Sequence, residues 1–167
     1  MPGKPRKEYA LTLNMAKELA MVENNDKGKE ARTYFIKAEE ALIKLKQNKR
    51  LEAFFELETM KDKFKSSIID IGGSENDYIQ IDYKSRKVLF NGEPLEDEIL
   101  HSVLLRGRSF ALEMARANIK TKEINTVDDA ENEAVTSHEE VRNTIIKNMG
   151  IKPEELPTEE NIKKLGE

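Results

Sequence analysis

Two runs of apolar residues at helical spacing, between Lys29 and Ile71, constrain the fold more than any other feature of the sequence. Within each run the apolar positions recur every three or four residues, which places them on one helix face. One helix over this range would be roughly 65 Å long at 1.5 Å per residue. A chain of 167 residues, 38% hydrophobic and 36% charged, cannot cover such a helix alone. The two runs are Tyr34, Ala38, Ala41, Leu42 and Leu45, then Leu57, Met60, Phe64, Ile68 and Ile71.

The sequence leaves two interpretations of these runs open. One is a continuous amphipathic helix that pairs with the same helix of a second chain, because the spacing of the second run is near a heptad repeat. The other is a break near Asn48, which would let two shorter helices fold back on each other. The first interpretation predicts a homodimer. Its predicted self-association residues are Leu57, Met60, Phe64 and Ile68.

A pair of glycines, Gly72 and Gly73, ends the second run and marks a boundary. Beyond it, residues 78–82 and 87–90 alternate between apolar and polar side chains, as strands do. The Asn91-Gly92 dipeptide that follows is typical of a tight turn. The pattern therefore predicts a small β-hairpin that docks on the helices.

Helical spacing returns in the C-terminal part of the chain. Apolar residues indicate one helix over residues 95–120, interrupted at Gly107, and another over residues 128–149, ended by Gly150. We therefore predict a mainly α-helical fold with a small β-hairpin, of the α+β class. Its predicted regions are residues 1–71, residues 72–94 and residues 95–167.

The side chains that usually carry chemistry are scarce. The sequence has no cysteine, and its two histidines, His101 and His138, lack ligand spacing and are predicted to be exposed. The acidic residues between Asp128 and Glu140 resemble a solvated helix face, without the ladder of a calcium loop. We predict no catalytic residue, no metal site, no cofactor and no enzymatic activity. The chain shows no signal peptide and no membrane-spanning run, which indicates a cytoplasmic protein.

Charge is divided unevenly along the chain. The first 65 residues carry 15 basic and 11 acidic side chains, whereas the remainder carries 13 basic and 21 acidic ones. Basic residues near the N-terminus and around a predicted helix start are candidates for contacts with phosphate groups. A solvated Lys- and Glu-rich surface is the alternative. The candidate nucleic-acid-binding residues are Lys4, Arg6, Lys7, Lys27, Lys29 and Arg32.

A helix-turn-proline corner near the C-terminus is the candidate site for a protein partner. Its predicted partner-binding residues are Val141, Arg142, Ile145 and Leu156. Local packing is the alternative for the apolar members. The Arg142 guanidinium can donate a forked pair of hydrogen bonds to a carboxylate of a partner, or equally to Glu154 or Glu155.

The stretch YALTLNMAKELAMVENNDKGKEARTYFIKAEEAL, with the preceding GKPRKE, resembles the second half of the phage AntA/AntB antirepressor domain, which is related to BRO-N domains. This resemblance covers residues 3–42. A second segment, VRNTIIKNMGIKPEELP followed by IKKL, resembles the C-terminal part of DNA-damage-inducible protein D. Both resemblances imply a regulatory protein of a mobile element without enzymatic turnover.

The expected function is therefore that of a phage or prophage antirepressor-like binding protein that acts on a repressor or transcription complex. An inhibitor of a host nucleic-acid enzyme, such as a CRISPR nuclease or a recombinase, is the alternative, because the acidic part of the chain could imitate a nucleic acid. A sequence-specific DNA-binding protein is a third candidate.

Overall fold

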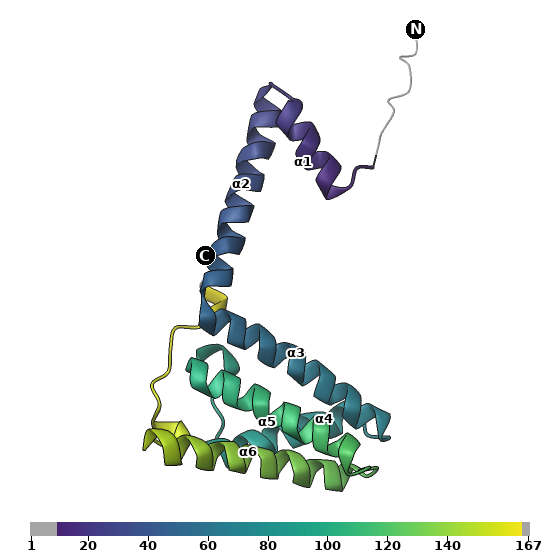
Figure 1. Cartoon of the computed structure of the whole chain (residues 1–167), viewed down its shortest axis with the longest axis vertical. Helices are drawn as coiled ribbons and strands as arrows, with labels where there is room; N and C mark the ends of the chain where they lie inside the picture. Colours follow the sequence, from purple (N-terminus) through teal and green to yellow (C-terminus); the bar gives the residue numbers. More distant parts are fainter. Residues whose placement is uncertain (1–9, 165–167) are drawn as a thin grey trace. The chain divides into compact units, whose positions relative to one another are not determined.

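The computed structural model describes residues 10–164, apart from the side chains of Ala20 and residues 44–47. In this range the chain forms six α-helices and three short 3₁₀ helices, with no β-strand (Figure 1). It divides into two compact units, residues 1–47 and residues 48–167, which we call unit 1 and unit 2. The predicted boundary at Gly72 thus lies inside unit 2.

Unit 1 is a hairpin of two helices, α1 (Leu13–Val22) and α2 (Asp26–Gln47). The Thr12 side chain caps α1 by accepting a hydrogen bond from the Met15 N–H at 3.3 Å. The helix therefore begins at Leu13, directly after this cap.

The turn between α1 and α2 depends on two small or polar residues. The Asn25 side chain accepts a hydrogen bond from the Gly28 N–H at 2.8 Å and so begins α2. A Cβ atom on Gly28 would lie 2.5 Å from the Glu23 carbonyl oxygen, so this position requires glycine. Lys17 of α1 holds the helices together by an ion pair with Glu39 at 2.7 Å.

Asn48 ends the helical run of α2, and α3 begins at the next residue. The Asn48 backbone is extended, and its side chain accepts hydrogen bonds from the N–H groups of Arg50 and Leu51. The chain therefore has the break near Asn48. It does not form the continuous helix from Lys29 to Ile71.

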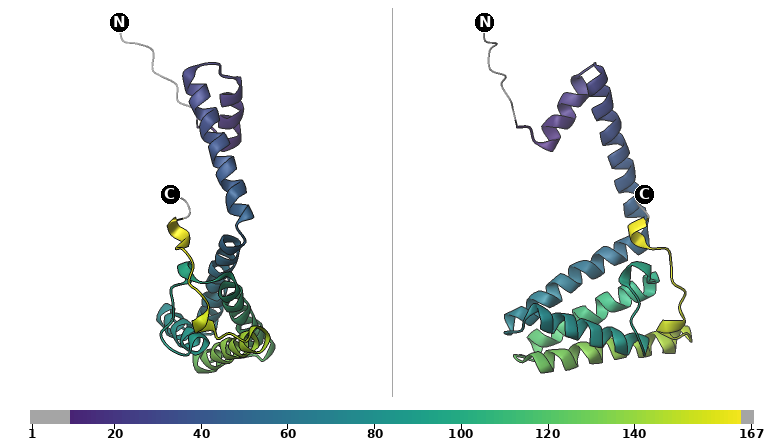
Figure 2. Two further views of the ribbon diagram at one scale, coloured as in Figure 1. Left: turned by 90° about the vertical axis from the view of Figure 1, so that its left-hand side faces the viewer. Right: turned by 180° about the vertical axis from the view of Figure 1, so that it is seen from behind.

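Unit 2 is a four-helix bundle. Around the bundle the order is α3, α5, α6, α4, because α3 packs on α5, α5 on α6 and α6 on α4 (Figure 2). Most of the packing thus joins helices that are not neighbours in sequence. The helices are α3 (Lys49–Asp70), α4 (Glu75–Phe90), α5 (Ser102–Thr121) and α6 (Val127–Met149), with 3₁₀ helices η1 (Asp97–Ile99), η2 (Pro153–Glu155) and η3 (Ile162–Lys164).

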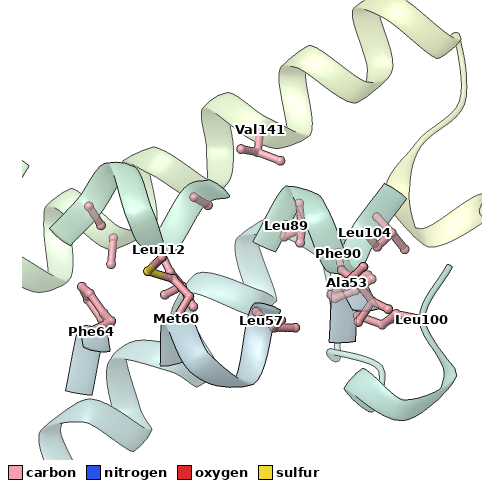
Figure 3. Packing of buried hydrophobic residues seen from close by; sticks show 14 of the residues in the cluster. Ala53, Leu57, Met60, Phe64, Leu89, Phe90, Leu100, Leu104, Leu112 and Val141 are labelled. Atoms are coloured by element: carbon pink, nitrogen blue, oxygen red, sulfur yellow. The ribbon is translucent and has the colours of Figure 1, made fainter. Parts of the chain in front are cut away.

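The apolar residues of α3 face the interior of this bundle. Leu57, Phe64 and Ile68 are fully buried and Met60 is 9% exposed. Figure 3 shows Met60 beside Leu112 of α5 in the packed core. These four side chains were predicted to associate with a second chain. They are instead covered by other helices of their own chain. The predicted self-association through this face of α3 is therefore wrong.

The predicted β-hairpin is wrong, because residues 75–90 form α4. Ser74 and Asp77 make a capping box at its start, and Asn91, in the left-handed conformation with φ 52°, ends it. Ile81, Ser85 and Leu89 are buried at a spacing of four residues, which is a helix face. Burial against α6 therefore outweighs the strand-like alternation of the sequence.

The C-terminal helices agree better with the sequence. The predicted helix over residues 128–149 is confirmed as α6, and Gly150, with φ 68°, ends it. Gly107 does not interrupt α5. Instead, a Cβ atom there would lie 3.0 Å from Cγ1 of Val141, so glycine allows α5 to approach α6 closely.

Arg50 joins the start of α3 to two distant segments of unit 2. Its buried guanidinium donates hydrogen bonds to the carbonyl oxygens of Leu100 at 2.8 Å, Glu98 at 2.7 Å and Glu160 at 2.7 Å. The Glu159 N–H donates to the Ile99 carbonyl oxygen at 2.9 Å beside it. One cation therefore satisfies three carbonyl groups, one in η1, one just after it and one just before η3.

Replacing Arg50 by Ala should destabilise unit 2 by about 3 kcal/mol, since three buried carbonyl groups lose a charged donor. Chemical denaturation followed by circular dichroism measures this change. Lys49→Ala, at the exposed neighbouring position, is the matched control and should change stability by less than about 0.5 kcal/mol. Equal effects of the two substitutions would show that the Arg50 hydrogen bonds contribute nothing.

Candidate functional site

A cluster of charged side chains lies inside unit 2. Arg108 of α5 is fully buried and donates hydrogen bonds to Asp97 of η1 and, at 2.6 Å, to Asp82 of α4. Lys61 of α3 adds a second cation, with Nζ 3.2 Å from Oδ2 of Asp97. Asp82 also lies 3.7 Å from Arg86, one turn further along α4. The cluster thus links three helices and the loop that carries η1.

The charges of this cluster keep one another ionised. Burial alone would raise the pKa of the Asp97 carboxyl, but the charge and hydrogen bond of Arg108, with Arg86 and Lys61, hold that pKa below its usual value. Burial would likewise lower the pKa of Arg108, and Asp97 and Asp82 instead raise it. Breaking the cluster would leave a buried charge without a partner, which is strongly destabilising.

His138 of α6 lies in the same region, and the prediction that it is exposed is wrong. Its side chain is fully buried, with Nδ1 2.8 Å from the Ala134 carbonyl oxygen and no hydrogen-bond partner for Nε2 among the described residues. Burial, together with the charge of Arg108, lowers the pKa of the imidazole from 6.5 to about 4. His138 is therefore neutral at physiological pH.

The chemical capacity of this cluster is limited by its burial. Arg108 and His138 have no exposed surface, so a substrate cannot contact them. Catalytic acids and bases must reach the reacting proton directly or through one water molecule. The cluster therefore serves the bundle itself, where it connects α3, α4 and α5 with the loop that carries η1.

Arg142 lies beside a groove between α4 and α6, with a volume of about 650 Å³. Its guanidinium donates to both carboxylate oxygens of Glu154, at 2.6 and 2.9 Å, and to the Leu89 carbonyl oxygen at 2.6 Å. These hydrogen bonds raise the pKa of Arg142 and lower that of Glu154. Arg142 therefore binds a carboxylate of its own chain, that of Glu154, which is one of the two alternatives that the sequence allowed.

The other candidate partner-binding residues of this corner lie in the core. Val141, Ile145 and Leu156 are each at most 7% exposed. They pack in the hydrophobic core of unit 2, as the local-packing alternative predicts. A partner could reach the exposed rim of the corner, at Met149 and Ile151, but not these three side chains.

Unit 1 carries the largest share of exposed apolar surface. Ten of its large hydrophobic side chains are exposed, against seven in the much longer unit 2. Gly28 is the one residue in the described part of unit 1 that is classed as buried, so the hairpin has no core of its own. The exposed residues are Leu11, Leu13, Met15, Leu19, Met21, Val22, Tyr34, Ile36, Leu42 and Ile43.

Three of these residues form a stripe on α1. Met15, Leu19 and Val22, spaced by four and three residues, share one helix face and are 52%, 52% and 82% exposed. Ala16 and Lys17 are partly buried and lie on the other side of α1. There Lys17 contacts the Phe35 ring and forms the ion pair with Glu39 of α2. The stripe therefore points away from α2 and has no covering element among the residues of unit 1 that the structure describes. We call it the α1 stripe.

The candidate nucleic-acid-binding residues are only partly described by the structure. Lys27 and Lys29 are exposed in the first turn of α2, and Arg32, one turn later, donates to the Glu23 carbonyl oxygen at 2.7 Å. Lys4, Arg6 and Lys7 lie outside the described residues. The structure therefore brings three of the six basic residues to one helix start, beside the acidic Glu23 and Asp26.

The part of the chain that the structure describes, residues 10–164, lacks a metal site and a membrane-spanning helix. No group of three or more His, Asp or Glu side chains there is arranged to hold a metal ion. No helix in that part is long and apolar enough to cross a lipid bilayer.

Comparison with known proteins gives one match. Residues 1–25 match the model of a family described as AntA/AntB antirepressor. No curated protein and no solved structure matches the chain. The antirepressor resemblance is thus supported over a shorter range than residues 3–42, and the resemblance of the C-terminal segment to DNA-damage-inducible protein D is not supported.

Neither of the features that distinguish the two units was predicted from the sequence. The α1 stripe was visible in the spacing of Met15, Leu19 and Val22, but its lack of cover depends on where α2 packs. The buried cluster had no sequence signal, because Asp82, Asp97 and Arg108 lie on three different elements and resemble surface residues in a sequence with 36% charged residues.

His138 should make unit 2 less stable in mild acid. The unfolded state binds a proton on this imidazole near pH 6.5 and the folded state only near pH 4. Stability is therefore full above pH 6.5 and falls by about 3 kcal/mol as the pH decreases to 4, at 1.36 kcal/mol per pKa unit. Denaturation curves between pH 4 and 7 measure this slope.

The control for this prediction is His138→Gln, which removes the titrating group. Whatever the stability of this variant at pH 7, its free energy of unfolding should change much less between pH 6.5 and 4 than that of the wild type. An unchanged slope would assign the acid sensitivity to other groups, such as Asp97 and Glu154, whose pKa values are lowered in the folded state and whose contribution is lost at lower pH.

Arg142→Ala should lower the melting temperature of unit 2, because the Glu154 carboxylate and the Leu89 carbonyl group lose their donor. We expect a loss of about 2 kcal/mol. Lys147→Ala, at an exposed position of the same helix, is the control and should have little effect. Loss of partner binding with an unchanged melting temperature would instead support the predicted partner contact of Arg142.

Proposed function

We propose that the chain is an antirepressor-like regulatory protein of a phage or prophage, which binds a repressor or transcription complex and has no catalytic activity. The support for this proposal begins with the match of residues 1–25 to the AntA/AntB antirepressor family. That match includes all of α1, the helix with the uncovered apolar stripe.

The main support for the proposal is that the residues matched by the antirepressor family include the α1 stripe. An exposed apolar patch on a small helical unit marks a site of protein contact more often than a chemical site. A helix that offers residues i, i+4 and i+7 fits a hydrophobic groove or a helix face of a partner. The α1 stripe, at Met15, Leu19 and Val22, has this spacing.

DNA contact is a secondary possibility within the same function. Lys27 and Lys29 are exposed at the start of α2, where free backbone N–H groups favour anions. Glu23 and Asp26 lie beside them and reduce the local positive charge. We therefore place the main contact on the apolar stripe, with the basic residues as a minor contribution.

One observation favours inhibition of a host nucleic-acid enzyme, such as a CRISPR nuclease or a recombinase, as the alternative. Four carboxylates of α6 are exposed and have no ion pair among the described residues; they are those of Asp128, Asp129, Glu139 and Glu140. A row of negative charges could occupy a site that normally receives phosphate groups. This alternative places the contact on unit 2, whereas the antirepressor proposal places it on unit 1.

A reporter assay distinguishes the two. Expression of the full chain should relieve repression of a promoter controlled by a repressor from the same genome, and Met15→Glu/Leu19→Glu should abolish the effect, since a buried unpaired carboxylate costs several kcal/mol. Glu139→Gln/Glu140→Gln, on α6, is the control and should relieve repression normally. Loss of function through the α6 variant alone would favour the alternative.

A further inference from the structure

Three side chains of unit 2 that have no exposed surface each hold a polar atom without a hydrogen-bond partner among the described residues. The three atoms are Oγ of Ser85 on α4, Nε of Arg108 on α5 and Nε2 of His138 on α6. Nearly all buried polar atoms of native proteins have a partner, which is either another protein atom or an ordered water molecule. Each of these three atoms therefore requires a partner.

The helices α4 and α6 pack side by side and run in the same direction. Towards the start of both helices Lys84 pairs with Glu131 at 2.7 Å, and further along Arg142 donates to the Leu89 carbonyl oxygen at 2.6 Å. Because both residue numbers rise together, the buried positions between these two contacts lie opposite each other in the bundle.

Ser85 and His138 are buried positions of this middle part, and Arg108 joins them from α5. Arg108 donates to Asp82 at 2.6 Å, and Asp82 lies three residues before Ser85, on the same side of α4. The charges of Arg108 and Asp82 also act on the His138 imidazole. The three unpartnered atoms therefore lie in one region of the core, between α4, α5 and α6.

The hydrogen bond on the other side of the imidazole determines what Nε2 can do. Nδ1 lies 2.8 Å from the Ala134 carbonyl oxygen, and a carbonyl oxygen only accepts hydrogen bonds, so Nδ1 carries the proton. In a neutral imidazole Nε2 is then unprotonated and needs a donor. The Nε–H group of Arg108, in contrast, can only donate.

The Ser85 hydroxyl differs from other hydroxyls of the helices. Five of them donate to the carbonyl oxygen four residues earlier in the same helix, which is a common arrangement for serine and threonine. Ser85 makes no such bond, so its hydroxyl is available to a partner outside its own helix. The five residues are Thr33, Thr59, Ser66, Ser67 and Thr121.

We propose that Ser85, Arg108 and His138 bind one ordered water molecule in the core of unit 2. The water donates to Nε2 of His138, accepts from the Nε–H group of Arg108 and makes its third hydrogen bond with the Ser85 hydroxyl. Buried water molecules typically make about three hydrogen bonds to polar groups that otherwise lack partners. The site thus connects three helices that are covered on all sides.

The chemistry of the site favours water over other ligands. A cation would meet the positive charge of Arg108, and an anion would meet the lone pair of Nε2 and the carboxylates of Asp82 and Asp97. The ligand must therefore be neutral and must both donate and accept. Close packing of the core admits only a small molecule of this kind.

A high-resolution crystal structure of the full chain tests the inference directly. It should show a solvent oxygen at about 2.7–3.2 Å from Nε2 of His138 and at a similar distance from Oγ of Ser85 and Nε of Arg108. A direct hydrogen bond from Ser85 to Nε2, or no solvent oxygen beside Nε2, would overturn the proposal. The inference does not depend on the proposed function, which uses the α1 stripe of unit 1.

Nuclear magnetic resonance tests the same site in solution. Long-range ¹H–¹⁵N spectra at pH 7 should show His138 protonated at Nδ1 and unprotonated at Nε2. Ser85→Ala removes one partner of the water and should shift the Nε2 resonance. Ser67→Ala is the matched control, because this buried serine donates to the Lys63 carbonyl oxygen of its own helix, and it should leave the resonance in place. A proton on Nε2, or equal effects of the two substitutions, would contradict the proposal.

Discussion

The buried Arg108 guanidinium is the constraint on which unit 2 depends. A fully buried cation cannot be left without partners, and its two carboxylates come from α4 and from the loop that carries η1. Hydrophobic packing alone would accept several arrangements of four similar amphipathic helices. The requirement that Asp82, Asp97 and Arg108 meet fixes the level at which α4, diagonally across the bundle from α5, and the η1 loop face the middle of α5.

Unit 1, in contrast to unit 2, has no buried cluster or core among its described residues that fixes its arrangement. Two helices of 10 and 22 residues cannot enclose a core, and their order rests on a helix cap, a glycine turn and the ion pair of Lys17 with Glu39. The apolar residues that would fill a core in a larger domain remain on the surface. The described part of unit 1 thus has no interior of its own, and the antirepressor match falls on this part of the chain.

The sequence predicted helices where local signals and periodicity agree. The helix ended by Gly150 was identifiable because its apolar spacing, acidic first turn and C-terminal glycine all indicate the same element. The helix α4 was not, because Tyr78, Ile79 and Ile81 favour a strand locally, and burial against α6 decides the outcome. The role of Leu57, Met60, Phe64 and Ile68 was equally beyond sequence reasoning, since a core stripe and an intermolecular seam have the same spacing.

The hydrogen bonds of Arg50 have a consequence for synthesis of the chain. Its three acceptors lie 48, 50 and 110 residues further along the sequence. While the ribosome extends the chain, α3 emerges first with a cation whose acceptors do not yet exist. Because the last acceptor, at Glu160, lies 110 residues after Arg50, α3 can reach its final environment only after that segment has been synthesised. Unit 2 therefore completes its folding only once residue 160 has emerged from the ribosome, while unit 1, whose contacts are local, can form earlier.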